Sequence, residues 1–437
     1  MSFLEIGLYS ITALLVMIFL RAPIGLAMLL CGMGGLYLAT GSPNMILARM
    51  KEEAYATFSN YSLSIIPMFL LMGQFSTVSG MSAALFKAAE SWLGHRRGGV
   101  AMASVGACAG FGAICGSSLA TAATMGRVAL PEMKRYGYPS GFASATLAAG
   151  GTLGILIPPS VILVIYAIIT EQNIAKLFLA AFVPGVLAAL GYMAVIAIYA
   201  RVNPAAAVVM PKLPLRARFA ALWAVWPVLV VFGLVVFGIY LGWFTPTEGA
   251  AVGAAGTGII ALASGNLTWA ALGQSILSTA RSTAMIFFII LGAGFYNGFL
   301  AMSRLPQELS GWIGGLEMAP LAVFAVILLF YLVMGCVLDS LSMILLTVPI
   351  FFPVMQGLDF GLSPEHLAIW FGILVLIVVE VGLITPPVGM NLFIIRAMDA
   401  EAPITDTYRA VVWFVLADIL RVVLLVLFPS ITLFLIA

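Results

Sequence analysis

Two proline pairs lie in the middle of apolar segments that are long enough to cross a lipid bilayer. Residues 154–160 read GILIPPS, and residues 382–391 read GLITPPVGMN. A proline pair breaks a helix, and a membrane protein tolerates such a break at mid-depth only where the backbone is buried in protein or lines a wet cavity. One break in each half of the chain is typical of the paired ion and substrate sites of secondary transporters.

The composition indicates an integral membrane protein over the whole length. The chain is 63% hydrophobic and 8% charged, whereas a soluble domain carries about 25% charged residues. The first apolar run, 3–20, has Glu5 rather than a basic leader near its start and lacks a small-residue cleavage site, so we expect a retained helix rather than a signal peptide. A net charge of +2 without a basic cluster argues against nucleic acid as a partner.

Windows of about 20 apolar residues predict the membrane spans. They lie at 3–20, 23–40, 55–79, 140–170, 177–200, 219–241, 247–263, 283–301, 367–395 and 410–436. Two further apolar stretches, 98–133 and 319–355, carry polar interruptions at GSS 116–118 and at Asp339 with Ser340. The pattern predicts an all-α polytopic membrane protein.

Four markers recur in the two halves of the chain. Pro23, Trp92, Gly116 and Pro158 match Pro246, Trp312, Asp339 and Pro386, at offsets of 223, 220, 223 and 228. A recurrence at nearly constant spacing predicts an internal repeat. We expect an N-terminal unit at 1–200, a Pro-rich basic linker at 201–218 and a C-terminal unit at 219–437.

Charges in the loops predict that the two units are inverted. The loops around 98–133 carry His95, Arg96, Arg97, Lys134 and Arg135, whereas those around 319–355 carry Arg304 with Glu308, Glu317, Asp359 and Glu365. Basic loops lie in the cytoplasm, so each interrupted stretch begins and ends on one side and forms a re-entrant hairpin. Each unit then has five crossings and one hairpin, and an odd number of crossings inverts the second unit. The broken helices are 140–170 and 367–395.

The proline pairs are expected to release backbone oxygens, because a proline removes the donor that serves the carbonyl four residues earlier. The carbonyls affected are those of Gly154, Ile155, Gly382 and Leu383. The residue before a proline also leaves the helical conformation, which turns the carbonyls of Ile157 and Thr385 off the axis. Free oxygens at mid-membrane suit a hard cation, with Na⁺ as the expected ion. The alternative is a plain proline kink, which is common in membrane helices.

The hairpin tips supply further polar groups. Ser117 or Ser118 in the first hairpin, and Asp339 or Ser340 in the second, can cap the helix that follows. Each hairpin would then direct a helix N-terminus, which favours anions, at the centre of the membrane. Small polar residues a turn further on also suit helix packing, which is the more frequent role of any one of them. These residues are Thr121, Thr124, Ser342 and Thr347.

Charged groups inside the spans are few, and an intramembrane charge is a functional candidate. Glu380 precedes the second break and is equally consistent with a structural clamp and with a role in coupling. Asp418 and Arg421 lie one turn apart and are expected to pair. Neither the histidines nor the cysteines have the spacing of a transition-metal site, and no cofactor is expected. They are His95, His366, Cys31, Cys108, Cys115 and Cys336.

Four motifs carry a resemblance to a known family. They are CGSSLATAATMGRVALPEM at 115–133, GTLGILIPPSVILVIYA at 151–167, TPTEGAAVGA at 245–254 and GLITPPVGMNLF at 382–393. Over nearly its whole length the chain resembles the large membrane (M) subunit of tripartite ATP-independent periplasmic (TRAP) transporters. The resemblance implies a Na⁺-driven, elevator-type importer of carboxylates such as C4-dicarboxylates or sialic acids, in the bacterial inner membrane. It also implies a periplasmic substrate-binding protein and a small four-helix membrane (Q) subunit, which we expect as a separate chain.

The resemblance also implies site residues. The first cation site would use Ser117 or Ser118, with carbonyls near Gly154, Ile157 and Pro159. The second would use Thr347 and carbonyls near Gly382, Thr385 and Pro387. The substrate carboxylate would lie near Thr121, Asp339, Ser340 and Asn391.

The sequence fits three alternative functions less well. A stand-alone dicarboxylate/Na⁺ symporter of similar hairpin architecture is the nearest alternative. An intramembrane enzyme would need a nucleophile beside a base, or paired aspartates, and the sequence has neither pattern. A membrane scaffold without transport activity would not need helices broken at mid-membrane.

Overall fold

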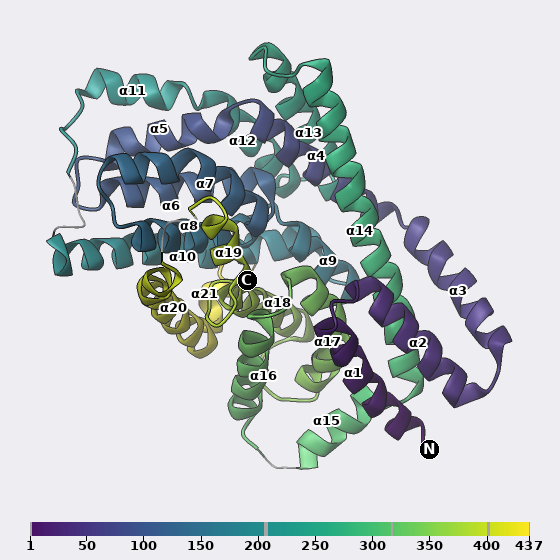
Figure 1. Ribbon diagram of the computed structural model, residues 1–437. Helices are drawn as coiled ribbons and strands as arrows, with labels where there is room; N and C mark the ends of the chain where they lie inside the picture. The colour runs from purple at the N-terminus through teal and green to yellow at the C-terminus, as the bar shows by residue number, and fades with distance from the viewer. Residues whose placement is uncertain (1, 205–208, 316–317, 400–402, 437) are drawn as a thin grey trace.

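The computed structural model describes residues 2–204, 209–315, 318–399 and 403–436 (Figure 1). Every regular element in these ranges is a helix, which confirms the predicted all-α class. Residues 205–208 of the predicted linker, and Glu317, lie outside the described part of the chain.

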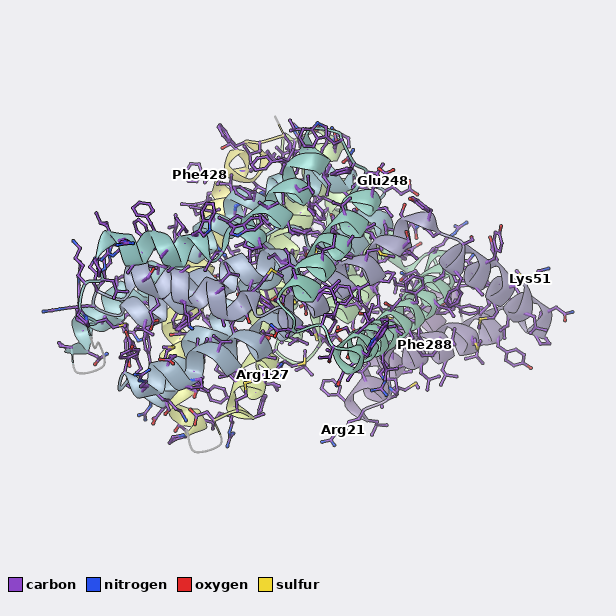
Figure 2. The ribbon with its side chains drawn as sticks, turned by 90° about the horizontal axis from the view of Figure 1, so that it is seen from above. Arg21, Lys51, Arg127, Glu248, Phe288 and Phe428 are labelled. Carbon is purple, nitrogen blue, oxygen red and sulfur yellow. The ribbon has the colours of Figure 1, made fainter. Side chains whose placement is uncertain are left out.

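The helices of the first half follow the predicted order, with one addition. They are α1 (Phe3–Phe19), α2 (Ile24–Thr40), α3 (Pro43–Phe58), the 3₁₀ helix η1 (Tyr61–Ser64), α4 (Ile65–Val78), α5 (Met81–Leu93), α6 (Gly99–Cys115), α7 (Ser118–Arg135), α8 (Ser140–Leu156), α9 (Val161–Ile169) and α10 (Ile174–Val202). The addition is α3, which carries Arg49, Lys51, Glu52 and Glu53. Figure 2 shows Lys51 at the outer edge of the molecule.

The second half contains a corresponding series of helices. They are α11 (Leu215–Trp223), α12 (Trp226–Tyr240), α13 (Pro246–Ala263), α14 (Trp269–Met302), α15 (Leu305–Gly315), α16 (Pro320–Gly335), α17 (Ser340–Gln356), α18 (Pro364–Gly382), α19 (Met390–Arg396), α20 (Ile404–Leu427) and α21 (Pro429–Leu433). The helix predicted at 283–301 is much longer than expected, since α14 has 34 residues.

Five helical segments of the described chain are long and apolar enough to cross a bilayer. They are Tyr61–Val78, α10, α14, α18 and α20. The bent pairs α8–α9 and α11–α12, with angles of 45° and 52°, bring the number to seven. Shorter apolar helices, including α1, α2, α6, α16 and α17, account for most of the other predicted spans. The chain is therefore a multi-pass membrane protein.

Glycines bring the two halves of the chain into close contact on one side of the molecule. Helix α2 packs along α14, and α4 packs along α13 (Figure 1). A Cβ atom on Gly25 would lie 3.0 Å from the Ile289 Cα, and one on Gly32 would lie 3.1 Å from the Tyr296 Cα. These contacts require glycine because the facing backbone cannot withdraw as a flexible side chain could.

The centre of the molecule is formed by the two helices that lead into the proline pairs. In α8, residues 141–156 are all buried, and in α18, residues 367–382 are all buried. A helix that is hydrophobic all round lies in a protein core or in a membrane, and these two helices are enclosed by protein. The short helices beyond the breaks cross over between the halves, since α9 contacts α17 and α19 contacts α7 and α8. Both hairpins therefore meet both broken helices.

Candidate functional site

The first hairpin consists of α6 and α7, joined by a tight turn. Gly116 ends α6 with a φ of +64°, a left-handed conformation that favours glycine. Ser117 is the N-cap of α7, and its side chain accepts a hydrogen bond of 3.4 Å from the Ala120 N–H. The predicted capping of this helix is confirmed, with Ser117 as the cap and Ser118 as the first helical residue.

The second hairpin, α16 and α17, uses a carboxylate in the same place. Asp339 is the N-cap of α17. Its Oδ2 accepts a hydrogen bond of 3.1 Å from the Ser342 N–H, and its Oδ1 accepts one of 2.5 Å from the Ser342 hydroxyl. The predicted cap is again confirmed, and Ser340 is the first residue of the helix.

The first break separates α8 from α9. Ile157 adopts an extended conformation, with φ −93° and ψ 118°, as expected for a residue before proline. Pro158 and Pro159 have no N–H to offer, so the carbonyls of Gly154 and Ile155 lack their helical donors as predicted. All residues from 151 to 160 are buried, so the unpaired oxygens face protein rather than the outer surface.

The second break differs, and here the expectation of free carbonyls is wrong. The Gly382 carbonyl accepts a hydrogen bond of 3.0 Å from the Thr385 N–H, and the Leu383 carbonyl accepts one of 3.1 Å from the Asn391 N–H. The chain makes a longer turn before α19 begins, and this turn supplies donors that replace those lost at the prolines. The Pro387 carbonyl accepts a hydrogen bond of 2.6 Å from the Tyr408 hydroxyl.

Each break is preceded by a glycine that touches a glycine of its neighbouring hairpin. A Cβ atom on Gly154 would lie 2.7 Å from the Ser117 carbonyl oxygen and would overlap the Thr121 hydroxyl. A Cβ atom on Gly382 would lie 2.5 Å from the Gly335 carbonyl carbon. The Thr121 hydroxyl is buried without a hydrogen-bond partner among the described residues, so it adds an available oxygen beside the first break.

A cavity of about 140 Å³ lies between the hairpin tips and the breaks. Its polar lining comes from Ser117 and Ser118 of the first hairpin and from Asp339 and Ser340 of the second. The N-termini of α7 and α17 therefore both border it, and helix N-termini favour anions. Apolar residues from other elements complete the wall, among them Ile155, Leu383, Leu70, Met285 and Ile286. Sequence reasoning missed the last three because their apolar side chains carry no signal of a site.

Two predicted ligands lie away from this cavity. The Thr347 hydroxyl donates to the Met343 carbonyl at 2.7 Å and contacts the Tyr331 hydroxyl at 2.8 Å. The Asn391 side chain is fully buried and donates to the Ala148 carbonyl at 3.2 Å. Both groups connect helices, and neither is among the residues that line the cavity.

The predicted pair at Asp418 and Arg421 is confirmed, with a separation of 2.7 Å between Oδ1 and Nη2. The pair belongs to a larger buried network. The Tyr192 hydroxyl donates a hydrogen bond of 2.7 Å to the Asp418 Oδ2 and lies 3.0 Å from the Thr152 hydroxyl. The network connects α20 and α10 to α8 two residues before Gly154.

Comparison with known proteins identifies the chain. Residues 11–431 match the family described as the tripartite ATP-independent periplasmic transporter, DctM component. The chain belongs to this family. It is 36% identical to the C4-dicarboxylate TRAP transporter large permease protein DctM of Pseudomonas aeruginosa, over 92% of each chain. It is 29% identical to the sialic acid TRAP transporter large permease protein SiaM of Vibrio cholerae, over 98% of this chain and 97% of that one.

The fold has a relative among solved structures. The crystal structure of the YdaH transporter of Alcanivorax borkumensis matches with a TM-score of 0.60 and covers 90% of each chain. The two sequences are 16% identical, so this likeness supports the fold alone. Because the sequence relatives are named as transporter permeases, this TRAP large permease subunit is a transporter and not an enzyme.

Proposed function

We propose that the chain is the translocating subunit of a Na⁺-driven, binding-protein-dependent carboxylate importer that works by an elevator mechanism. The units 1–200 and 219–437 would be inverted copies. The matching order of their helices and the glycine contacts at both breaks support this relationship. The hairpins and broken helices would move together, and the outer helices would form the scaffold.

The cavity between the two hairpin tips is the observation that carries the proposal. Two capped helix N-termini border it, and each comes from a different half of the chain. The partial positive charge and unused N–H groups of a helix N-terminus stabilise a carboxylate. Relatives named for C4-dicarboxylate and sialic acid both carry carboxylate substrates, and the proposed substrate class is an organic acid of this kind.

The first cation position would lie beside the first break, where several oxygens converge. The Gly154 backbone touches the Ser117 carbonyl and the unpartnered Thr121 hydroxyl. A hard cation such as Na⁺ prefers oxygen ligands of this type. At the second break the remaining candidate is the Thr385 carbonyl, because the Gly382 and Pro387 carbonyls accept hydrogen bonds. Thr347 and Asn391 stay predictions as ligands. The Thr347 hydroxyl already bonds to Tyr331 and the Asn391 amide nitrogen to Ala148, each on a neighbouring helix.

The proposed assembly contains two further proteins. The family is described as tripartite, and this chain matches its DctM component. A small four-helix membrane subunit and a periplasmic substrate-binding protein would supply the other parts, in the inner membrane of a bacterium. Exposed apolar side chains on α1, α2, α12, α14 and α20 suit contact with lipid or with another membrane subunit.

Reconstitution in liposomes tests the function. The chain would be purified with its small subunit and supplied with its binding protein, and uptake of labelled dicarboxylate or sialic acid would be measured. We expect uptake only when an inward Na⁺ gradient and the binding protein are both present. Full uptake by this subunit alone in Na⁺-free buffer would contradict the proposal. Na⁺-dependent uptake that needs no binding protein would instead favour a stand-alone symporter.

A further inference from the structure

Glu380 is a buried carboxylate with a hydrogen bond to only one of its two oxygens among the described residues. Its side chain is 1% exposed near the end of α18. Oε1 accepts a hydrogen bond of 2.6 Å from the Ser340 hydroxyl. Oε2 is buried and has no hydrogen-bond partner among the described residues. None of the ion pairs found in the described part of the chain involves Glu380.

The carboxylate lies beside the cavity that both hairpin tips line. Ser340 belongs to the second hairpin, and Ser118 of the first hairpin lies beside the same carboxylate. Both serines line the cavity, as does Leu383, three residues after Glu380. The unused oxygen is therefore held at the junction of the two halves of the chain, next to the proposed substrate position.

The hydrogen bond and the helix dipole together stabilise only one of the two carboxylate oxygens. The hydrogen bond from Ser340 and the N-terminus of α17 stabilise one oxygen. The other remains in a buried environment, where an unpaired charge is costly. The nearby groups that can share a ligand with it are hydroxyl oxygens, from Ser118 and Ser340. Oxygen donors around one negative charge suit a small monovalent cation better than an anion or an amine.

We propose that Glu380 supplies the anionic ligand of a Na⁺ site at the junction of the hairpin tips, together with the hydroxyls of Ser118 and Ser340. The site is additional to the cation positions at the two breaks, and the inference rests on the proposed Na⁺ coupling. A cation held there bonds to α18 and to both hairpins at once. Its binding therefore ties the two hairpin tips to α18 beside the proposed substrate cavity.

The test is Na⁺-dependent thermal stabilisation of the purified complex with its small subunit. Melting would be followed across a NaCl series, with choline chloride keeping the ionic strength constant. We expect Glu380→Gln to raise the Na⁺ concentration for half-maximal stabilisation at least tenfold. The control is Glu365→Gln at the start of the same helix, where the carboxylate is 44% exposed; its Na⁺ midpoint should match that of the wild type.

The outcomes separate this inference from the proposed function. If Na⁺ does not stabilise the wild-type complex more than choline does, the Na⁺ coupling itself is wrong. If Na⁺ stabilises the wild type and the Glu380→Gln midpoint is unchanged, the site is wrong and the coupling stands. If Glu380→Gln does not fold, Ser118→Ala and Ser340→Ala take its place, since they keep the carboxylate. Unchanged midpoints in both serine variants would overturn the site.

Discussion

The Tyr192 hydroxyl on α10 donates a hydrogen bond of 2.7 Å to Asp418 on α20. The same hydroxyl lies 3.0 Å from that of Thr152 on α8. One side chain thus joins three helices, and it does so close to the first proline pair.

Replacing Tyr192 with Phe should destabilise the protein by about 1–2 kcal/mol, because it leaves the buried Asp418 oxygen without a donor. Tyr199→Phe on the same helix is the matched control, since the Tyr199 hydroxyl makes none of the hydrogen bonds found among the described residues. Thermal unfolding in detergent measures both variants. Equal losses would show that the Tyr192 hydroxyl contributes nothing specific.

Gly154→Ala should impair folding or transport, because the added methyl group overlaps the Thr121 hydroxyl and approaches the Ser117 backbone. Such overpacking typically costs about 1–3 kcal/mol. Gly191→Ala on α10 is the control, because a Cβ there meets nothing within 4 Å. Size-exclusion profiles and uptake assays compare the two. A Gly154→Ala variant with normal stability and normal uptake would contradict the close contact at the first break.

Asp339 variants can separate helix capping from charge. Asp339→Asn keeps a good N-cap and should preserve thermal stability, whereas Asp339→Ala should lose about 1 kcal/mol. If the carboxylate also acts on substrate or ion, Asp339→Asn will fold normally and transport poorly. Melting curves and uptake rates are measured on the same preparations. Equal stability of the Asn and Ala variants would argue against capping by Asp339.

Two ion pairs with the same geometry should differ in strength. Lys134–Asp399 and Lys176–Glu365 both have separations of 2.6 Å, but the Asp399 side chain is 1% exposed and the Glu365 side chain is 44% exposed. Lys134→Ala leaves a buried carboxylate unpaired and should cost about 1–3 kcal/mol.

Lys176→Ala should cost less than about 1 kcal/mol, as is usual for exposed pairs. Chemical or thermal unfolding of both variants gives the comparison. A cost for Lys176→Ala that equals or exceeds that of Lys134→Ala would show that burial of the partner does not decide the strength of these pairs.

The pKa of His95, in the loop between α5 and α6, lies below its ordinary value because of desolvation and then because of nearby cations, chiefly Arg218. The wild-type ring therefore stays neutral to a lower pH than a free histidine. Arg218→Gln should raise the pKa of His95, because it removes a repelling charge. The chain has two histidines, so NMR titration with His366→Asn as the assignment variant can follow the ring. No upward change would contradict the effect of Arg218.

The features that the sequence predicted well are those decided by neighbours along the chain. Pro158 and Pro159 break the helix through their own covalent structure, and Ser117 and Asp339 cap helices within three residues of themselves. The ion pair of Asp418 with Arg421 also lies within one turn. In each case, residues within one helical turn were enough to predict the feature.

The features that it predicted badly depend on residues far away in sequence. The carbonyl of Leu383 regains a donor, the Asn391 N–H, because the chain after the second prolines turns back toward α18. The hydroxyl of Thr347 is directed toward Tyr331 by the packing of the hairpin. Helix α3 was not predicted because its charged residues make the segment too polar to be recognised as a membrane span. Its position depends on contacts with Gly294 and Gly298 of α14.

The two breaks differ in their enclosure, and this has a consequence for the order of events in transport. Residues 151–160 are wholly buried, whereas Pro387 at the second break is exposed. If ions bind as proposed, one beside the first break would leave only after protein elements separate, so its lifetime there would be set by a conformational rate. One beside the second break would have a shorter path to solvent and would exchange without a conformational change. Release of the first ion would then be a slow step of each transport cycle. The second ion would stay in rapid equilibrium with the ions in solution.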